Sequence, residues 1–434
     1  MALDPYTRAM LLHETRALMA RLARVKSFAL QETMLPAAAL LPSAQSAIDK
    51  YLVVGRRQLR RNLRQYLGWL QHPISDVATP EEAQRRFTML RLKFNVVLTQ
   101  FDLFSDVITQ RSENEIGVWL GGLDVVSADA LELPPYYTAP PVICYVDRDI
   151  GAAIRRARTR LPGGGMNPVA VIRVPRERMV GTGIASSLVH EVGHQAAALL
   201  DLVGSLRPIL KGLQRGSVAS RLPWQLWERW ISEIVADFWS VARVGVASTI
   251  GLMGVVSLPR PFVFRLNVDD PHPMPWIRVK LSAAMGEALY PHPQWQRLGA
   301  LWESYYPPVG LALETQTLLA QLVESMPAFV SVLLHHRPRS LYGRSLLEVM
   351  DIAPRQPARL AALYRRWGAN PSEMYRAPPT IVFAVIGQAR ADGDISAEDE
   401  SALLSKLLTY WALRATVNTT ELCAAVPAMR KAAA

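Results

Sequence analysis

Cysteine is almost absent from this chain, whose 434 residues include only Cys144 and Cys423, far apart in the sequence. Two cysteines cannot build the disulfide framework of a small secreted domain, and such sparse use suits a reducing compartment. The first residues also lack a basic segment leading into an apolar core, so no signal peptide is predicted. These absences predict a cytoplasmic protein.

Long apolar runs are also lacking. A membrane-spanning helix needs about 20 consecutive apolar residues. The most apolar stretch, residues 244–258, is shorter and is flanked by Arg243 and Arg260. It predicts a buried helix, with membrane insertion as the alternative. Hydrophobic residues make up 50% of the chain and charged residues only 20%, which excludes a mainly disordered protein.

Acidic residues are outnumbered, and the resulting net charge of +11 is carried mainly by arginine. In the densest basic run, residues 56–64, leucines fall at helical spacing, which predicts a solvated helix face covered by long arginine side chains. Contact with an anionic membrane surface or a polyanion is the alternative. No specific nucleic-acid partner is expected, because no zinc-finger, winged-helix or RNA-binding signature accompanies the run.

The pattern of apolar residues predicts a mainly α protein with a small β-sheet, in the α+β class. Helices are expected over residues 6–34, 47–70, 80–111 and 150–160, and strands over residues 142–146 and 169–175. Thr79, Pro80 and Glu82 form a typical helix start, with Thr79 as the N-cap. The Pro-rich segment 132–141 separates a helical N-terminal domain, residues 1–130, from a central domain, residues 131–290, which is followed by a helical C-terminal region, residues 291–434.

The stretch that carries chemistry is residues 188–195, which contains the pattern His190-Glu191-x-x-His194. On a helix the two histidines lie one turn apart on one face, where their imidazoles can bind one metal ion. Glu191 can then take a proton from a water on the open side of that metal. The alternative is a surface helix that happens to carry two histidines, but the flanking residues are apolar or small.

A second motif follows in the apolar helix expected around residues 230–239, where Glu233 and Asp237 lie four residues apart. A zinc site needs a third protein ligand, and the Glu233 carboxylate is suitable. Asp237 can accept a hydrogen bond from the other ring nitrogen of a ligand histidine. The alternative is an ordinary helix face that pairs with nearby arginine or lysine residues.

Together the two motifs resemble those of the gluzincin metallopeptidases, whose pattern is H-E-x-x-H followed by E-x-x-x-D. The resemblance implies that His190, His194 and Glu233 bind zinc, that Glu191 is the general base, and that Asp237 supports a ligand histidine. The pattern is most similar to that of the prenyl-protease-like peptidases, although this chain lacks their clear membrane-spanning helices. The implied fold is a zincin-like core, over about residues 142–285, flanked by helical regions.

Two further segments gain an interpretation from this resemblance. His272, in a Pro-His-Pro segment, and Arg278 resemble residues that border the active site in the prenyl-protease-like group. His272 can hydrogen-bond an oxyanion and Arg278 can orient a carboxylate or support the cleft; the alternative is a stiff turn with an exposed imidazole. Residues 169–175 are expected either as an edge strand that pairs with a substrate peptide or as a plain core strand.

The expected activity is that of a zinc metalloendopeptidase that acts on a protein or peptide substrate. The alternative is a non-catalytic zincin-fold scaffold that binds a partner through its flanking helical regions. Zinc is the only cofactor expected, because the glycine-rich segment 161–168 lacks both the Lys-Ser/Thr of a phosphate-binding loop and the spacing of a dinucleotide fingerprint.

Overall fold

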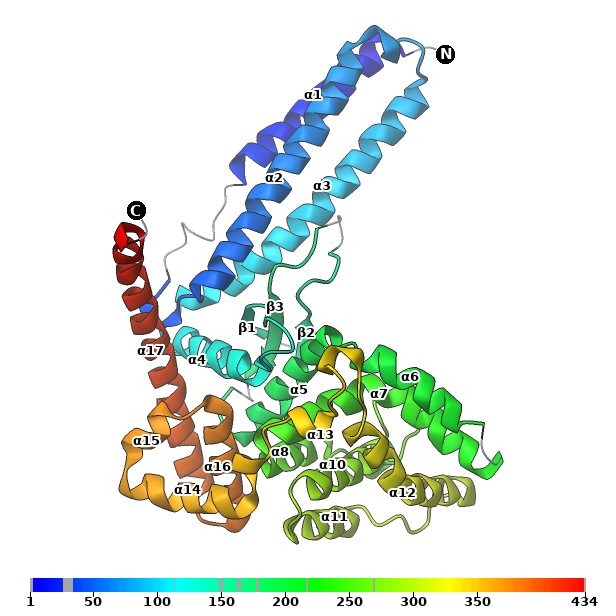
Figure 1. Cartoon of the computed structure of the whole chain (residues 1–434). Coiled ribbons are helices and arrows are strands. Elements are labelled where there is room, and N and C mark those ends of the chain that lie inside the picture. Colours follow the sequence, from blue (N-terminus) through cyan, green and yellow to red (C-terminus); the bar gives the residue numbers. More distant parts are fainter. Residues whose placement is uncertain are drawn as a thin grey trace. The chain divides into compact units, whose positions relative to one another are not determined.

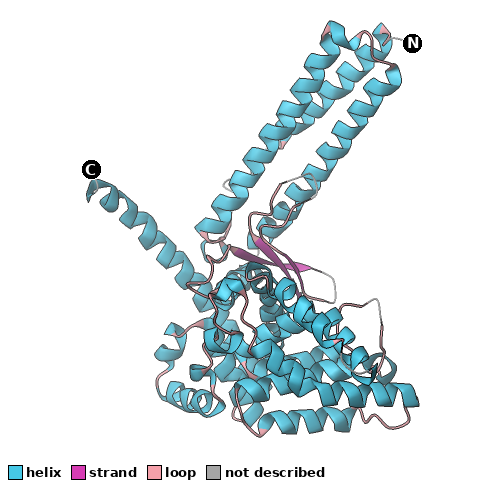
Figure 2. Ribbon diagram, turned by 45° about the vertical axis from the view of Figure 1, so that its right-hand side comes forward, coloured by secondary structure: helices cyan, strands magenta, loops and turns pink. Residues whose placement is uncertain are grey.

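A computed structural model describes residues 3–25, 34–112, 114–147, 151–161, 165–176, 179–215, 218–267 and 270–432. The chain is 74% helical and has a small three-stranded sheet, which confirms the expected mainly α class with a minor β component (Figure 2). By its internal contacts the chain divides into two compact units. Unit 1 comprises residues 1–118, 156–170 and 415–434, and unit 2 comprises residues 119–155 and 171–414.

Unit 1 is built on three long helices, α1 (Pro5–Arg24), α2 (Pro42–Gln71) and α3 (Pro80–Thr109) (Figure 1). The predicted helix start is confirmed, because Thr79 Oγ1 accepts a hydrogen bond from the Glu82 N–H at 3.1 Å. Along α3 an apolar stripe is buried, including Phe87, Phe94 and Phe101. The helix predicted over residues 6–34 ends instead at Arg24, and residues 26–33 of that prediction lie outside the described residues.

The sheet contains β1 (Val142–Asp147), β2 (Ala153–Arg155) and β3 (Ala170–Pro175) in the order β1-β3-β2. β2 pairs antiparallel with β3, with Ile154 opposite Ile172. The helix predicted over residues 150–160 is therefore wrong where the structure describes it, because pairing with β3 outweighs the local helical pattern; Ile150 lies outside the described residues. β3 is the central strand, so the edge-strand interpretation is also wrong and the core-strand alternative holds.

Unit 2 is a helical assembly. Its helices, of which α4 begins and α17 ends in unit 1, are α4 (Asn114–Leu131), α5 (Thr182–Leu199), α6 (Leu202–Leu213), α7 (Val218–Val244), α8 (Val246–Val256), α9 (Arg260–Val263), α10 (Pro275–Leu289), α11 (Gln294–Tyr305), α12 (Leu313–Leu334), α13 (Leu346–Val349), α14 (Pro357–Ala369), α15 (Pro371–Arg376), α16 (Pro379–Asp392) and α17 (Ala397–Ala432). Residues on both sides of position 290 belong to this one unit.

The centre of unit 2 is the packing of α5 against α7 and α8. Two glycines allow this close approach. A Cβ atom on Gly193 would lie 2.8 Å from Ala236 Cα, and one on Gly251 would lie 2.5 Å from Ser186 Cβ. Large aromatic side chains of α7, including Trp230 and Trp239, are fully buried around this contact. The helices that carry both sequence motifs are thus held side by side.

The most apolar stretch forms α8, whose side chains are mostly buried, as the buried-helix prediction requires. Among the described residues one helix, α12, is long and apolar enough by length and composition to cross a membrane. In its most apolar window 44% of the residues are buried within the protein.

Candidate metal centre

Helix α5 presents both motif histidines on one face. His190 and His194 are one turn apart, with ring centroids separated by 4.8 Å and ring planes at 87°. Both side chains are mostly buried, with 12% and 17% of their surface exposed. The helix carries this geometry because its remaining surface is apolar and packs on α7 and α8.

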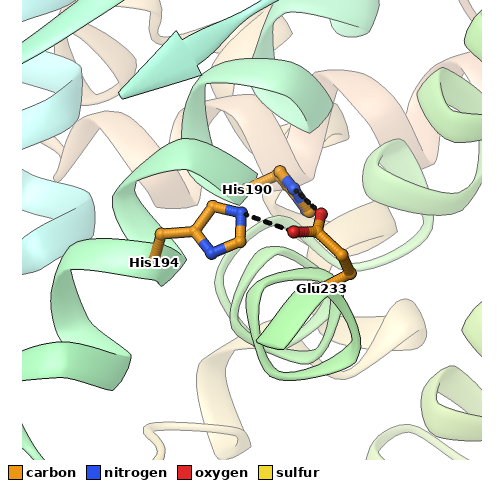
Figure 3. Close-up of side chains that lie close together, drawn as sticks. All are labelled: His190, His194 and Glu233. Carbon is orange, nitrogen blue, oxygen red and sulfur yellow. Dashed lines mark ion pairs between the residues drawn. The ribbon is translucent and has the colours of Figure 1, made fainter. Parts of the chain in front are cut away.

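Helix α7 brings Glu233 to the two histidines, although it is 39 positions beyond His194 in the sequence. The Nε2 atom of His190 lies 3.3 Å from Glu233 Oε2, and the Nε2 atom of His194 lies 3.5 Å from Glu233 Oε1. One ligand atom from each residue falls within a group less than 4.8 Å across. Figure 3 shows the two imidazoles and the carboxylate converging on one point.

These three residues fit a divalent metal by their chemistry. Two imidazole nitrogens and a carboxylate oxygen are a donor set that zinc commonly binds. The Glu233 Oε2 atom is buried and faces two imidazole nitrogens, His190 Nε2 at 3.3 Å and His272 Nε2 at 3.2 Å. A buried carboxylate oxygen that faces imidazole nitrogens requires a cation for stabilisation, either a proton or a metal ion.

Asp237, one turn beyond Glu233 on α7, fixes the orientation of His190. Its Oδ1 atom lies 2.8 Å from His190 Nδ1. Because an ionised carboxylate only accepts hydrogen bonds, Nδ1 carries a proton, and Nε2 is the ring nitrogen that faces Glu233. The predicted partnership of Asp237 with a histidine is therefore present in the structure.

Arg278 of α10 holds Asp237 in turn. Its Nε atom donates to Asp237 Oδ2 at 2.7 Å, and its terminal Nη2 atom donates to Asp237 Oδ1 at 2.9 Å. This is the paired geometry in which arginine binds carboxylates most strongly. The sequence suggested that Arg278 orients a carboxylate or supports the cleft, and the carboxylate it binds is that of Asp237.

The pKa values of the centre show how strongly it stabilises charge. Burial alone would lower the pKa of His190, but the Asp237 carboxylate outweighs this and raises that pKa to about 9. Burial would raise the pKa of Glu233, but the neighbouring imidazoles hold it well below its usual range. The pKa of Asp237 is likewise lowered, since Arg278 and His190 outweigh the effect of burial.

His272 lies beside the same carboxylate, from the segment that precedes α10. Its Nε2 atom is 3.2 Å from Glu233 Oε2, while 49% of its side chain remains exposed. Its pKa is raised, chiefly by the interaction with Glu233. The imidazole is therefore half exposed, as the alternative of a stiff turn expected, and it also contacts Glu233 of the centre.

Asp270 is a site residue that the sequence reasoning missed. Its Oδ1 atom accepts the His272 backbone N–H at 2.9 Å and lies 2.6 Å from His272 Nδ1. This fixes the ring so that Nε2 points toward Glu233. A signal was present in the sequence, because an aspartate commonly accepts the backbone N–H two residues later in a turn.

A cavity of about 180 Å³ adjoins the centre. It is lined by His190, Glu191, Asp237, His272 and Arg278, together with residues of α5, the β1–β2 connection and α8. Glu191 is buried, with 8% of its surface exposed, and faces this space rather than bulk solvent. A small molecule or side chain in the cavity would contact Glu191 and His272 together.

Comparison with known proteins adds no assignment to this geometry. A scan against protein-family models, a search of the curated proteins and a search of the solved structures each found no match. The functional interpretation therefore depends on the site itself.

Proposed function

We propose that this chain is a zinc-dependent metallopeptidase that hydrolyses peptide bonds, with a zincin-like core of the gluzincin type. The observation that carries the proposal is the convergence of His190, His194 and Glu233 within 4.8 Å, beside a cavity that Glu191 lines. Three protein ligands leave a coordination position open, as catalytic zinc sites require. A cytoplasmic location remains a prediction.

In this proposal His190, His194 and Glu233 hold the metal. When bound, zinc supplies Lewis acidity, which lowers the pKa of a water molecule and polarises a carbonyl group. Asp237 keeps the proton of His190 on Nδ1, so that Nε2 is free to bind. Arg278 fixes Asp237 through two hydrogen bonds and compensates its buried charge.

Glu191 acts as the general base and then as the general acid. Its carboxylate takes a proton from the attacking water and delivers it to the leaving amine, so that the residue ends in its starting state. Its burial in the wall of the cavity limits competing contact with bulk water. In its protonated form His272, held by Asp270, donates a hydrogen bond from Nε2 to the oxyanion that forms on the scissile carbonyl.

The decisive experiment compares wild type with Glu191→Gln, for both zinc content and hydrolysis of casein and fluorogenic peptides. We expect the variant to retain about one zinc per chain, because Glu191 is not a ligand. Turnover should fall by a factor of about 10² to 10⁴, because a general base is lost. Glu228→Gln, on α7 but paired with Arg207 at the surface, is the matched control and should retain both properties.

Near-normal hydrolysis by Glu191→Gln would rule out the general-base assignment. Wild type that holds zinc but cleaves neither substrate would contradict peptidase activity and favour the non-catalytic binding module. Absence of zinc from wild type after incubation with the metal would overturn the metal site. Glu233→Ala supplies the complementary test, because it should lose zinc while Glu228→Gln keeps it.

A further inference from the structure

Unit 1 contains a pocket of about 510 Å³ that has no part in the metal centre. All of its lining residues come from α2, α3 and the segment 165–168, which belong to unit 1. Its volume lies in the range of small-molecule sites in proteins. The three walls and their chemistry indicate what kind of molecule it can hold.

The pocket has a buried apolar floor and an exposed apolar rim. Leu59 of α2 and Val97 of α3 form the floor, with exposures of 1% and 9%. Val54 and Met166 stand at the rim, each 55% exposed. A molecule in the pocket would therefore cover side chains that otherwise expose large apolar surfaces to water, which favours binding of an apolar chain.

The third wall is held in place by backbone hydrogen bonds. The Leu161 N–H donates to Gly165 O at 2.7 Å, and the Asn167 N–H donates to Thr159 O at 2.8 Å. Gly165 lies so close to the Tyr51 ring that an added Cβ would be 2.7 Å from Tyr51 Cε2. The segment thus packs directly on α2 and closes one side of the pocket.

Among the described residues, the charged side chains that line the pocket are two lysines, Lys50 on α2 and Lys93 on α3. Neither forms a salt bridge with a carboxylate among the described residues. Unit 1 as a whole has 21 basic and 12 acidic residues, so it carries +9 of the net charge of +11. A ligand of this pocket is therefore expected to carry negative charge beside its apolar part.

We propose that this pocket binds an anionic amphiphile, with its hydrocarbon chain along the apolar floor and its carboxylate or phosphate head beside Lys50 or Lys93. The pocket follows α2 from Ala47 to Leu59, a separation of about 18 Å along the helix axis. This length suits an extended chain better than a compact ring system. The proposal is independent of zinc and of peptidase activity.

The test uses the full chain and the fluorescent fatty acid 11-(dansylamino)undecanoic acid, whose emission rises in apolar surroundings. We expect saturable binding of about one probe per chain. Val54→Trp should weaken it at least about tenfold by filling the pocket from its exposed rim. The double variant Lys50→Glu/Lys93→Glu should weaken probe binding by a similar factor.

The matched control is the double variant Arg60→Glu/Arg64→Glu. It makes an equal charge change at exposed positions of α2 outside the pocket. It should change the affinity for the probe less than about twofold.

Absence of saturable binding, or an equal loss in both charge-reversed variants, would overturn the proposal, because the second result means general adsorption to a basic surface. Unchanged affinity in Val54→Trp would also overturn it.

Competition experiments test recognition of the head group. Displacement of the probe by dodecanoate and dodecyl phosphate, with dodecanol at least about tenfold weaker, supports this recognition. Equal competition by dodecanol contradicts it. Phosphatidylglycerol vesicles that displace the probe identify a membrane lipid as the source, whereas vesicles that leave it bound identify a free amphiphile. Zinc content, measured on every variant, reports folding of unit 2 separately.

Discussion

Asp237 connects two buried side chains at the metal centre, because its carboxylate accepts hydrogen bonds from His190 and from Arg278. We expect Asp237→Asn to lower zinc affinity by a factor of about 10 to 100, since the ligand histidine loses its charged partner. Arg278 would also be left buried without a countercharge, which costs about 3–5 kcal/mol of unfolding free energy. Chelator competition measures the first effect and urea denaturation the second. Equal zinc affinity in wild type and variant would contradict the positioning role.

His336 is a buried histidine outside the metal centre, and its Nε2 atom lies 2.8 Å from Ser205 Oγ. Burial lowers its pKa from the ordinary 6.5. The unfolded state therefore binds the proton more readily than the folded state. The free energy of unfolding is highest above the pKa of the unfolded state, and it decreases as the pH falls below that value toward the lowered pKa of the folded state.

Urea denaturation of wild type at about pH 7.5 and about pH 5 should show this loss, and His336→Gln should show less of it. The exposed neighbour His335 provides the control, since His335→Gln should keep the wild-type pH dependence. An identical loss of stability in wild type and His336→Gln would show that other groups cause it.

Among the helices, the contact between α5 and α7 sets the distance between the histidines and Glu233. Gly193→Ala would place a Cβ atom 2.8 Å from Ala236 Cα and 2.9 Å from Ala236 O, so the helices would have to separate. Alanine is intrinsically the better helix former, yet we expect this variant to lose about 1–3 kcal/mol of stability and much of its zinc affinity.

The control for this prediction is Gly183→Ala on the same helix, where the added Cβ has no neighbour within 4 Å. It should be neutral or slightly stabilising in thermal denaturation and should bind zinc normally. If both substitutions behaved alike, helix propensity rather than interhelical distance would govern this contact.

Local signals in the sequence predicted the elements that depend on near neighbours. The i, i+4 spacing of His190 and His194 and the Thr79-Pro80 helix start are both reproduced. The errors concern contacts between distant segments. Residues 153–155 become a strand because β3 is available to pair with them, and β3 lies centrally because β2 covers its second edge. Nothing in the local pattern of either segment encodes that partner.

The same distinction applies to the candidate site. Glu233 and Asp237 were identified by their spacing. The alternative interpretation, an ordinary charged helix face, predicted that they pair with arginine or lysine. Asp237 does pair with Arg278, but it also binds His190, while Glu233 faces three imidazoles. Asp270 and the pocket of unit 1 could not be predicted in this way, because each depends on side chains that the fold brings together.

For the whole molecule, the uneven charge of the two units predicts where polyanions adsorb. Arg57, Arg60, Arg61 and Arg64 are exposed on α2 and form no salt bridge with another described residue. Replacing these four arginines by alanine should lower the salt concentration that elutes the chain from heparin. Four exposed arginines of unit 2 form the control set, which should have a smaller effect: Arg297, Arg339, Arg359 and Arg376. Equal shifts for both sets would show that net charge alone determines retention.

Unit 1 is assembled from three separate stretches of the chain, and the last of them is residues 415–434. During synthesis these residues leave the ribosome only after all of unit 2 has been made. Although domains usually fold in the order in which they emerge, the unit that contains residues 1–118 also needs residues 415–434, which follow every residue of unit 2. A product that stops at residue 414 would contain every residue of unit 2, including the metal centre, but an incomplete unit 1.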